Sequence, residues 1–234
     1  MPPQSTRMIA LQDIAAQDIT ALVLAGGRAT RMGGVDKGLQ PFRGTPLALH
    51  AARRVQPQVG SVLINANRHL DTYRSWGLPV VSDADESFAG PLAGFAAGLA
   101  HCRTPWLLAL ACDTPLFAHD LAQRLAAAAC GAGAPIAIAA APQHGQEAGN
   151  GAREAAQDGA GPPLHMHPAL CLLHVSLLPD LQQFLAGGGR RVRQWGARHG
   201  CAIAVFDQPG DSPQAFANAN TLEQLRALEE QAAG

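Results

Sequence analysis

The sequence predicts an α/β fold in which a single doubly wound, mostly parallel sheet is flanked by helices. Short apolar runs alternate regularly with helix-like stretches along the 234 residues, as expected of successive strand–helix–strand units. The runs are apolar throughout, so both faces of the strands are expected to be buried under helices. A chain of this length suits one such domain and is long enough to bury a sizeable core.

Each element of this fold has its own stretch of sequence. The runs expected to form strands are 19–25, 61–67, 79–83, 106–113, 134–140, 168–174 and 201–207. The stretches expected to form helices are 46–58, 90–102, 119–129, 176–187, 190–200 and 221–230. Thr221 and Gln224 have the spacing of a capping box at the start of the last helix, where they are expected to bond free N–H groups.

The domain organisation follows from two stretches that lack this pattern. We expect residues 1–18 to form a flexible tail, which lacks the apolar core of a secretory signal, and residues 19–234 to form one domain. Residues 141–163 are rich in glycine, alanine, proline and glutamine and show no sustained period. Because strand-like runs resume on both sides, this stretch is expected to be a surface insertion and not a linker between domains.

Composition and charge exclude several classes of protein. The formal net charge is −1, so the basic excess typical of a nucleic-acid groove is missing. No apolar run reaches the roughly 18 residues of a membrane-spanning helix. The cysteines are scattered and never spaced CxxC, which indicates reduced thiols, no zinc site and a cytoplasmic location. No long apolar stripe demands a partner, so we expect a monomer or, as the alternative, a weak oligomer.

The first expected strand leads into a loop with the chemistry of a phosphate site. Residues 24–39 read LAGGRATRMGGVDKGL. The glycines let backbone N–H groups approach an anion, and Arg28, Arg31 and Lys37 supply positive charge for phosphate oxygens. Neither GxGxxG nor GxxxxGK[ST] is present, which argues against a dinucleotide redox site and a P-loop NTPase. The loop predicts a polyphosphate ligand, with a purely structural turn as the alternative.

Three further strands also end in polar or charged residues. Asn65 ends the second expected strand, Asp83 the third and Asp113 the fourth. Ligands of open α/β sheets bind outside the carboxyl ends of the strands, so these groups are expected to meet the glycine loop. A single carboxylate such as Asp113 suits Mg²⁺, which takes one or two carboxylates together with substrate phosphates. A polyphosphate loop beside such a carboxylate predicts phosphoryl or nucleotidyl transfer.

With these residues in place, the sequence resembles the molybdenum cofactor guanylyltransferases, a family of the nucleotidyltransferase superfamily with a Rossmann-like fold. The family pattern LAGGxxxRMGGxDKGL is present in full at 24–39. NANR at 65–68, GPLAG at 90–94 and CDTP at 112–115 also match. The resemblance runs from about Ile19 to the last helix and leaves out the tail and the insertion.

The resemblance implies roles for particular residues. It implies GTP contacts for Leu24, Ala25, Gly26, Gly27, Lys37, Asn65, Asp83 and Asp113. It implies catalytic roles for Lys37, Arg31 and Asp113, with Asp113 also holding Mg²⁺. Shorter matching motifs imply that the pterin side of the site is lined by Arg190, Arg191, Asn218 and Asn220.

The implied reaction joins GMP from GTP to the terminal phosphate of molybdopterin-bound molybdenum and releases pyrophosphate. Its nucleophile is a phosphate oxygen that is already ionised, so no general base is needed. Catalysis then depends on holding two anions in line and neutralising them. The resemblance also implies transient contacts with the molybdenum insertase and with the molybdoenzyme or its chaperone.

Several residues have plainer interpretations. Asp113 is able to cap the helix that follows it, Asp83 to read guanine, bind ribose or lie in a solvated turn, and Asn65 to bond its own turn. Arg190 and Arg191 also suit a solvated helix start. His165 and His167 form an HxH pair without a third ligand nearby in sequence, so an ordinary surface or hydrogen-bonded role is expected for them. Cys112 beside Asp113 is expected to be a buried packing thiol.

Other functions stay open at this point. A related enzyme would use CTP on the same cofactor, or a nucleoside triphosphate on a sugar phosphate. A non-catalytic carrier would bind the cofactor and deliver it, and a sensor would hold GTP without forming pyrophosphate. Nucleotide preference and cofactor-dependent pyrophosphate release distinguish these functions.

Overall fold

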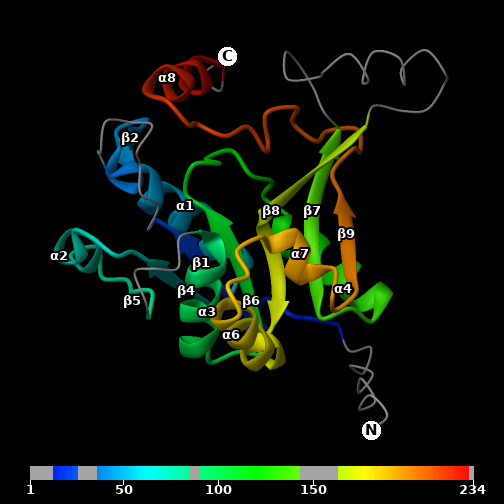
Figure 1. Cartoon of the computed structure of the whole chain (residues 1–234). Helices are drawn as coiled ribbons and strands as arrows, with labels where there is room; N and C mark the ends of the chain where they lie inside the picture. Colours follow the sequence, from blue (N-terminus) through cyan, green and yellow to red (C-terminus); the bar gives the residue numbers. More distant parts are fainter. Residues whose placement is uncertain (1–12, 26–35, 85–89, 143–162, 232–234) are drawn as a thin grey trace, which may run out of the picture.

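The computed structural model describes residues 13–25, 36–84, 90–142 and 163–231. Within these residues one sheet has the strand order β5-β4-β1-β6-β8-β7-β9 (Figure 1). Its strands are β1 (Ile19–Leu24), β4 (Ser61–Asn65), β5 (Val80–Val81), β6 (Trp106–Ala111), β7 (Ile136–Pro142), β8 (Leu164–His174) and β9 (Cys201–Val205). All the strands expected from the sequence are present, in the expected chain order.

The pairing confirms a mostly parallel sheet. β1 is parallel to β4 and β6, β4 is parallel to β5, and β7 is parallel to β9. β8 alone among the strands of this sheet runs antiparallel to both of its neighbours, β6 and β7. β7 and β8 follow one another in the chain and pair directly, an arrangement that antiparallel strands reach without a crossover helix.

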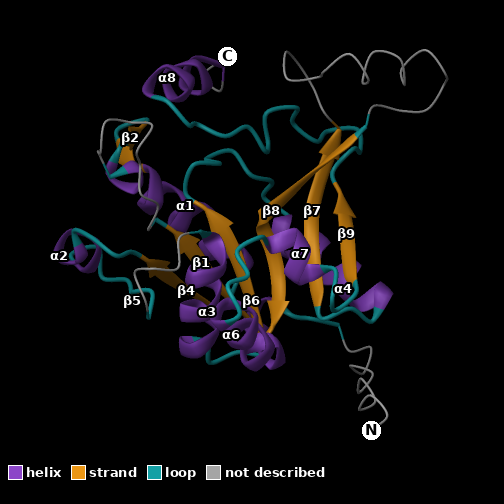
Figure 2. Cartoon of the chain, in the orientation of Figure 1, coloured by secondary structure: helices purple, strands orange, loops and turns teal. Residues whose placement is uncertain are grey.

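Helices cover both faces of the sheet, as expected of a doubly wound fold (Figure 2). The helices are α1 (Leu47–Val55), α2 (Leu70–Arg74), α3 (Pro91–His101), α4 (Leu121–Ala132), α6 (Leu178–Ala186), α7 (Val192–Gly196) and α8 (Leu222–Gln231). α3, α6 and α7 share one buried core with Leu22 of β1, whereas α1 and α4 share the other core with Val23. Neighbouring strand residues therefore bury opposite faces, which explains why the strand sequences are apolar throughout.

Some short elements were not expected from the sequence. β2 (Pro41–Phe42) and β3 (Thr45–Pro46) form a small antiparallel hairpin, and 3-10 turns occur at η1 (Ala16–Asp18), η3 (Lys37–Leu39), η4 (Gln56–Gln58) and η5 (Val175–Leu177). Ile14 packs against the core, so part of the stretch expected to be a loose tail belongs to the packed structure.

The expected insertion has different edges in the structure. Ala141 and Pro142 belong to β7, where they continue the pairing with β8, and β8 begins at Leu164. β7 thus extends two residues into the stretch expected to be the insertion, because its pairing with β8 continues past the apolar run. Residues 143–162 of the insertion lie outside the described residues. No helix among the described residues is long and apolar enough to cross a membrane.

Candidate active site

The carboxyl ends of β4, β1 and β6 lie side by side at one edge of the sheet. Leu24 at the end of β1 pairs with Asn65 on one side and with Ala111 on the other. The backbone N–H of Ala25 donates to Asn65 O (2.8 Å), which continues this register beyond the strands. The strand-end residues expected to meet at one edge are therefore brought to it.

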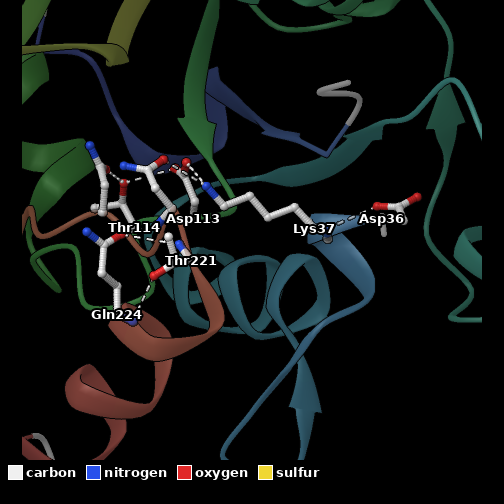
Figure 3. A network of polar contacts seen from close by, with 9 residues as sticks. Asp36, Lys37, Asp113, Thr114, Thr221 and Gln224 are labelled. Atoms are coloured by element: carbon white, nitrogen blue, oxygen red, sulfur yellow. Dashed lines mark hydrogen bonds and ion pairs between the residues drawn. The ribbon is translucent and has the colours of Figure 1, made fainter. Parts of the chain in front are cut away.

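Lys37 and Asp113 form the charged centre of this edge. Lys37 Nζ donates to Asp113 Oδ2 at 2.6 Å and to Asn220 Oδ1 at 3.1 Å (Figure 3). The two side chains of the ion pair are 18% and 22% exposed, so each is reachable from solvent while mostly enclosed. Charge-assisted hydrogen bonds of this length are strong and well oriented. The pair therefore presents an oriented ammonium and an oriented carboxylate at this edge of the sheet, partly open to solvent.

The segment between β9 and α8 closes onto Asp113 from the C-terminal side of the chain. Ala219 N donates to Asp113 O (2.8 Å), and the buried hydroxyl of Thr114 donates to Asn218 Oδ1 (2.8 Å). Together with the Asn220–Lys37 bond, these contacts place Asn218 and Asn220 beside the charged centre. The resemblance had assigned both asparagines to the pterin side, and the structure shows only that they adjoin Lys37 and Asp113.

The capping box at the start of α8 is confirmed and helps to fix Asn220. Gln224 N donates to Thr221 Oγ1 (3.1 Å), while Gln224 Oε1 accepts from the N–H groups of Thr221 (3.2 Å) and Asn220 (2.8 Å). The helix start thereby holds the backbone of Asn220, while the Asn220 side chain bonds Lys37.

Arg124 of α4 anchors the other end of this segment. Its guanidinium donates to Asp211 Oδ1 (2.7 Å) and Oδ2 (3.0 Å), to Val205 O, and lies 3.9 Å over the Phe206 ring. Burial alone would raise the pKa of Asp211, but the hydrogen bonds from Arg124 and from Gln208 N–H, with the Arg124 charge, outweigh it and lower that pKa. The sequence did not predict this contact, because nothing in the sequence around Arg124 or around Asp211 indicates that the two residues meet.

A second polar cluster, formed by Asn65, Asn67 and Asp83, lies at the ends of β4 and β5. Asn65 Nδ2 donates to Asp83 Oδ1 (2.9 Å), and Asn67 Nδ2 donates to Asp83 Oδ2 (2.8 Å). Asp83 N donates in return to Asn67 Oδ1 (2.9 Å). Each carboxylate oxygen keeps a further lone pair, so Asp83 is an oriented acceptor for donors of a ligand. The sequence indicates Asn67 only as part of the NANR motif, and its role in orienting Asp83 was not expected.

Gly94 of α3, the last residue of GPLAG, packs closely against Leu24 and Asn65. A Cβ at position 94 would lie 2.6 Å from Leu24 Cδ2 and 2.7 Å from Asn65 Oδ1. Both contacts are shorter than van der Waals distance, so a methyl group at position 94 would force the side chains of Leu24 and Asn65 to shift.

Arg190 and Arg191 lie exposed between α6 and α7. Arg190 Nη1 donates to the carbonyl oxygens of Leu185 (3.1 Å) and Gly189 (2.7 Å). These bonds tie Arg190 to the turn that follows α6. The hydrogen bonds that the structure describes for Lys37, Asp113 and Asp83 include neither arginine. Gly26, Gly27, Arg28 and Arg31 of the glycine loop lie outside the described residues.

His167 and Cys112 lie outside the hydrogen bonds of the charged centre that Lys37 and Asp113 form. His167 stacks on Phe216 with ring centroids 4.8 Å apart, and burial, with His165 adding to it, lowers the pKa of His167 to about 4. Among the described residues no group of three or more His, Cys, Asp or Glu side chains is arranged to hold a metal ion. Cys112 is buried, and burial first and then Asp113 raise the pKa of its thiol well above the ordinary range, so it stays protonated and unreactive.

An α/β sheet with a lysine, a carboxylate and oriented amides at the carboxyl ends of its first strands defines the class as a nucleotidyltransferase. A model of the MobA-like NTP transferase domain matches residues 21–200, and the chain belongs to this family. The Lys37–Asp113 pair lies within the matched range, whereas Asn218 and Asn220 lie beyond it.

Curated relatives match over almost the whole chain. A protein of Acidovorax ebreus named molybdenum cofactor guanylyltransferase is 56% identical over 216 residues, which cover 92% of this chain and 97% of the relative. A Bordetella pertussis protein of the same name is 49% identical over 212 residues, 91% of this chain and 97% of the relative. These findings confirm the family resemblance drawn from the motifs.

Solved structures show the same fold at lower identity. Molybdopterin-guanine dinucleotide biosynthesis protein A from Archaeoglobus fulgidus superposes with a TM-score of 0.66 at 18% identity, covering 92% of this chain and 98% of that one. CMP:2-keto-3-deoxy-manno-octonic acid synthetase complexed with CTP superposes with a TM-score of 0.67 at 14% identity, covering 92% and 97%. They confirm the predicted fold class.

Proposed function

We propose that this protein transfers GMP from GTP to the terminal phosphate of the molybdopterin-bound molybdenum cofactor. A phosphate oxygen of the cofactor forms a bond to the α-phosphorus of GTP, the bond from that phosphorus to the bridging oxygen breaks, and pyrophosphate leaves. The observation that carries the proposal is the meeting of Lys37 and Asp113 at the carboxyl edge of β1 and β6. The 56% identity to a relative named for this reaction supports the nucleotide and the acceptor.

In this proposal the residues at the carboxyl edge of the sheet bind the two anionic substrates, GTP and the cofactor. Lys37 places a positive charge where the triphosphate would lie, and the proposed partners in the glycine loop are Gly26, Gly27 and Arg31. Leu24 and Ala25 would contact the nucleotide from the end of β1, with Asn65 and Asp83 as polar groups for the guanosine. Because the attacking phosphate is ionised near neutral pH, the chain has no proton to remove from it. Orientation and charge neutralisation then account for the rate.

Mg²⁺ is the metal that we propose for this site. Asp113 is a partly exposed carboxylate that pairs with the Lys37 ammonium at 2.6 Å. One carboxylate together with substrate phosphates is a donor set that Mg²⁺ accepts. When bound, Mg²⁺ would neutralise phosphate charge that develops during transfer. Asp113 would hold it, and Lys37 would then be released toward the phosphates.

We also propose the setting in which the reaction occurs. A reactive cofactor is best handed over directly, which favours transient contacts with the molybdenum insertase and with the molybdoenzyme or its chaperone. The free thiols of the chain suit the reducing cytoplasm. Residues 19–234 are proposed to act as one monomeric domain, with the stretch near 141–163 as an insertion and without nucleic-acid or membrane binding.

Pyrophosphate release tests the proposal. The protein is supplied with Mg²⁺ and either GTP or CTP, with and without molybdopterin-bound molybdenum. Release that requires the cofactor and occurs with GTP but not CTP is the expected result. Release with CTP instead would move the assignment to a cytidylyltransferase. GTP binding without release under any condition would replace transfer by a carrier or sensor function.

A further inference from the structure

Behind Lys37 lies a second carboxylate, Asp36, that points away from the charged centre (Figure 3). Asp36 is 6% exposed, and its Oδ1 accepts from Gly38 N at 3.1 Å. Asp36 therefore caps the turn η3 that begins with Lys37. Its backbone oxygen also accepts from Leu39 N (3.2 Å) and from Gln40 Nε2 (3.2 Å). One residue thus fixes the turn from which the catalytic lysine extends.

The hydroxyl of Tyr73 holds this carboxylate from the other side. Tyr73 lies on the short helix α2, is fully buried, and donates to Asp36 Oδ1 at 2.8 Å. A buried carboxylate is tolerated only where donors satisfy it, and here the donors at Oδ1 are this phenol and the Gly38 amide. Burial first, and then the Asp36 carboxylate, raise the pKa of Tyr73 far above its usual range. The phenol therefore keeps its proton and acts as a donor at every working pH.

Gly38 shows how closely the tyrosine is fitted to the turn. A Cβ at position 38 would lie 2.4 Å from Tyr73 Oη and 3.0 Å from the Cβ of Ala25. The DKG sequence of the loop thus has a physical reason for each residue. Asp36 accepts from the tyrosine, Lys37 reaches Asp113, and Gly38 leaves room for the phenol oxygen.

We propose that Tyr73 is a positioning residue for the transfer reaction, since its hydroxyl fixes Asp36 and Asp36 fixes the turn that aims Lys37 at Asp113. The inference rests on the proposed function, in which the Lys37 ammonium binds the triphosphate. In the proposed role Tyr73 itself contacts neither the lysine Nζ nor the substrates. Its influence passes through the backbone of residues 36–38.

Tyr73→Phe is the direct test, because it keeps the buried ring and removes only the hydroxyl. The expected result is a kcat about tenfold lower, since small misplacements of a charged catalytic group reduce rates strongly. Thr20→Val is the matched control. It also removes a buried hydroxyl, one bonded to Ser61 Oγ (2.9 Å) and Thr104 Oγ1 (2.7 Å) at the opposite end of β1. Its kcat is expected to stay within about twofold of wild type.

A double-mutant cycle separates positioning from general loss of structure. In a Lys37→Met background there is no ammonium to aim, so adding Tyr73→Phe should lower kcat no further. An undiminished tenfold loss in that background would overturn the proposal, as would an unchanged kcat in Tyr73→Phe alone. Asp36→Asn should show the same dependence on Lys37, and it replaces Tyr73→Phe in the cycle if that variant does not fold.

The dissociation constant for GTP is a second measurement, and it does not depend on turnover. With Mg²⁺ present, Tyr73→Phe is expected to weaken GTP binding several-fold, and to have no effect when Lys37 is Met. If wild type binds GTP but releases no pyrophosphate, the proposed function is wrong. The double-mutant cycle can still be evaluated in that case, from the dissociation constants of the four proteins for GTP. Equal weakening in both backgrounds would overturn the role of Tyr73.

Discussion

The Lys37 ammonium lies 2.6 Å from Asp113 although 76 positions separate the two residues in the chain. β1 and β6 are parallel neighbours, so the loop after one and the turn after the other leave the same edge of the sheet. The 3-10 turn at Lys37–Leu39 then directs the lysine across that edge. The ion pair therefore joins the turn η3 to the end of β6, and it depends on the fold as well as on the local sequence of either segment.

Asp113→Ala is expected to lower the rate of transfer by on the order of a hundredfold. The substitution removes the proposed metal ligand and leaves the Lys37 ammonium without its carboxylate partner. The rate is measured as pyrophosphate release at saturating GTP and Mg²⁺. Asp71→Ala is the matched control, since Asp71 is an exposed carboxylate that pairs with Arg74 at 3.4 Å and should leave the rate unchanged. A rate within a fewfold of wild type in Asp113→Ala would exclude a catalytic role for this residue.

Gly94→Ala is expected to raise the KM for GTP about tenfold, because the added methyl group must displace Asn65, whose Oδ1 would lie 2.7 Å from it. That displacement breaks the 2.9 Å bond from Asn65 to Asp83 and turns the acceptor away from the nucleotide. Gly98→Ala, on the same helix, would instead place a methyl 2.5 Å from Leu22 Cδ2 in the core. The two variants should lose similar stability in urea unfolding, and only Gly94→Ala should change KM. Equal KM values in the two would contradict the proposed role of this cluster.

Much of the site was accessible from the sequence, for a definable reason. Strand ends are local features, and parallel strands bring them to one edge, so Asn65, Asp83 and Asp113 were predictable together. Pairings between distant segments, such as Thr114 with Asn218 and Arg124 with Asp211, carry no local signal. The antiparallel direction of β8 also depends on tertiary pairing, since a buried strand has the same apolar sequence in either direction.

Asn218→Ala is expected to lower the free energy of unfolding by about 1–2 kcal/mol, since it leaves the buried Thr114 hydroxyl without the acceptor that lies 2.8 Å away. The segment that carries Asn220 to Lys37 would also loosen, so transfer activity should fall severalfold. Urea unfolding and pyrophosphate release measure the two effects. Gln208→Ala, an exposed change in the same segment, should alter neither. Unchanged stability in Asn218→Ala would show that this bond does not hold the segment.

His167 is expected to make stability fall as the pH is lowered from about 6.5 toward 4. Burial, the main cause, together with His165 lowers the pKa of His167 from its ordinary 6.5 to about 4 in the folded chain. Between these values the unfolded chain binds a proton that the folded chain does not, so stability rises with pH across this window and is lost as the pH falls. The loss ends once the pH passes below the folded pKa.

His167→Phe tests this, because phenylalanine keeps an aromatic ring against Phe216 and takes up no proton. Urea unfolding of both proteins is compared from pH 8 to pH 5. The difference between them should be constant above pH 7.5, and by pH 5 wild type should lose on the order of 1 kcal/mol more than the variant, a figure reduced for partial solvent screening. His50 and His174, whose pKa values are also lowered by burial, are present in both proteins and cancel. Parallel profiles down to pH 5 would show that the His167 ring is solvated enough to titrate as it does in the unfolded chain.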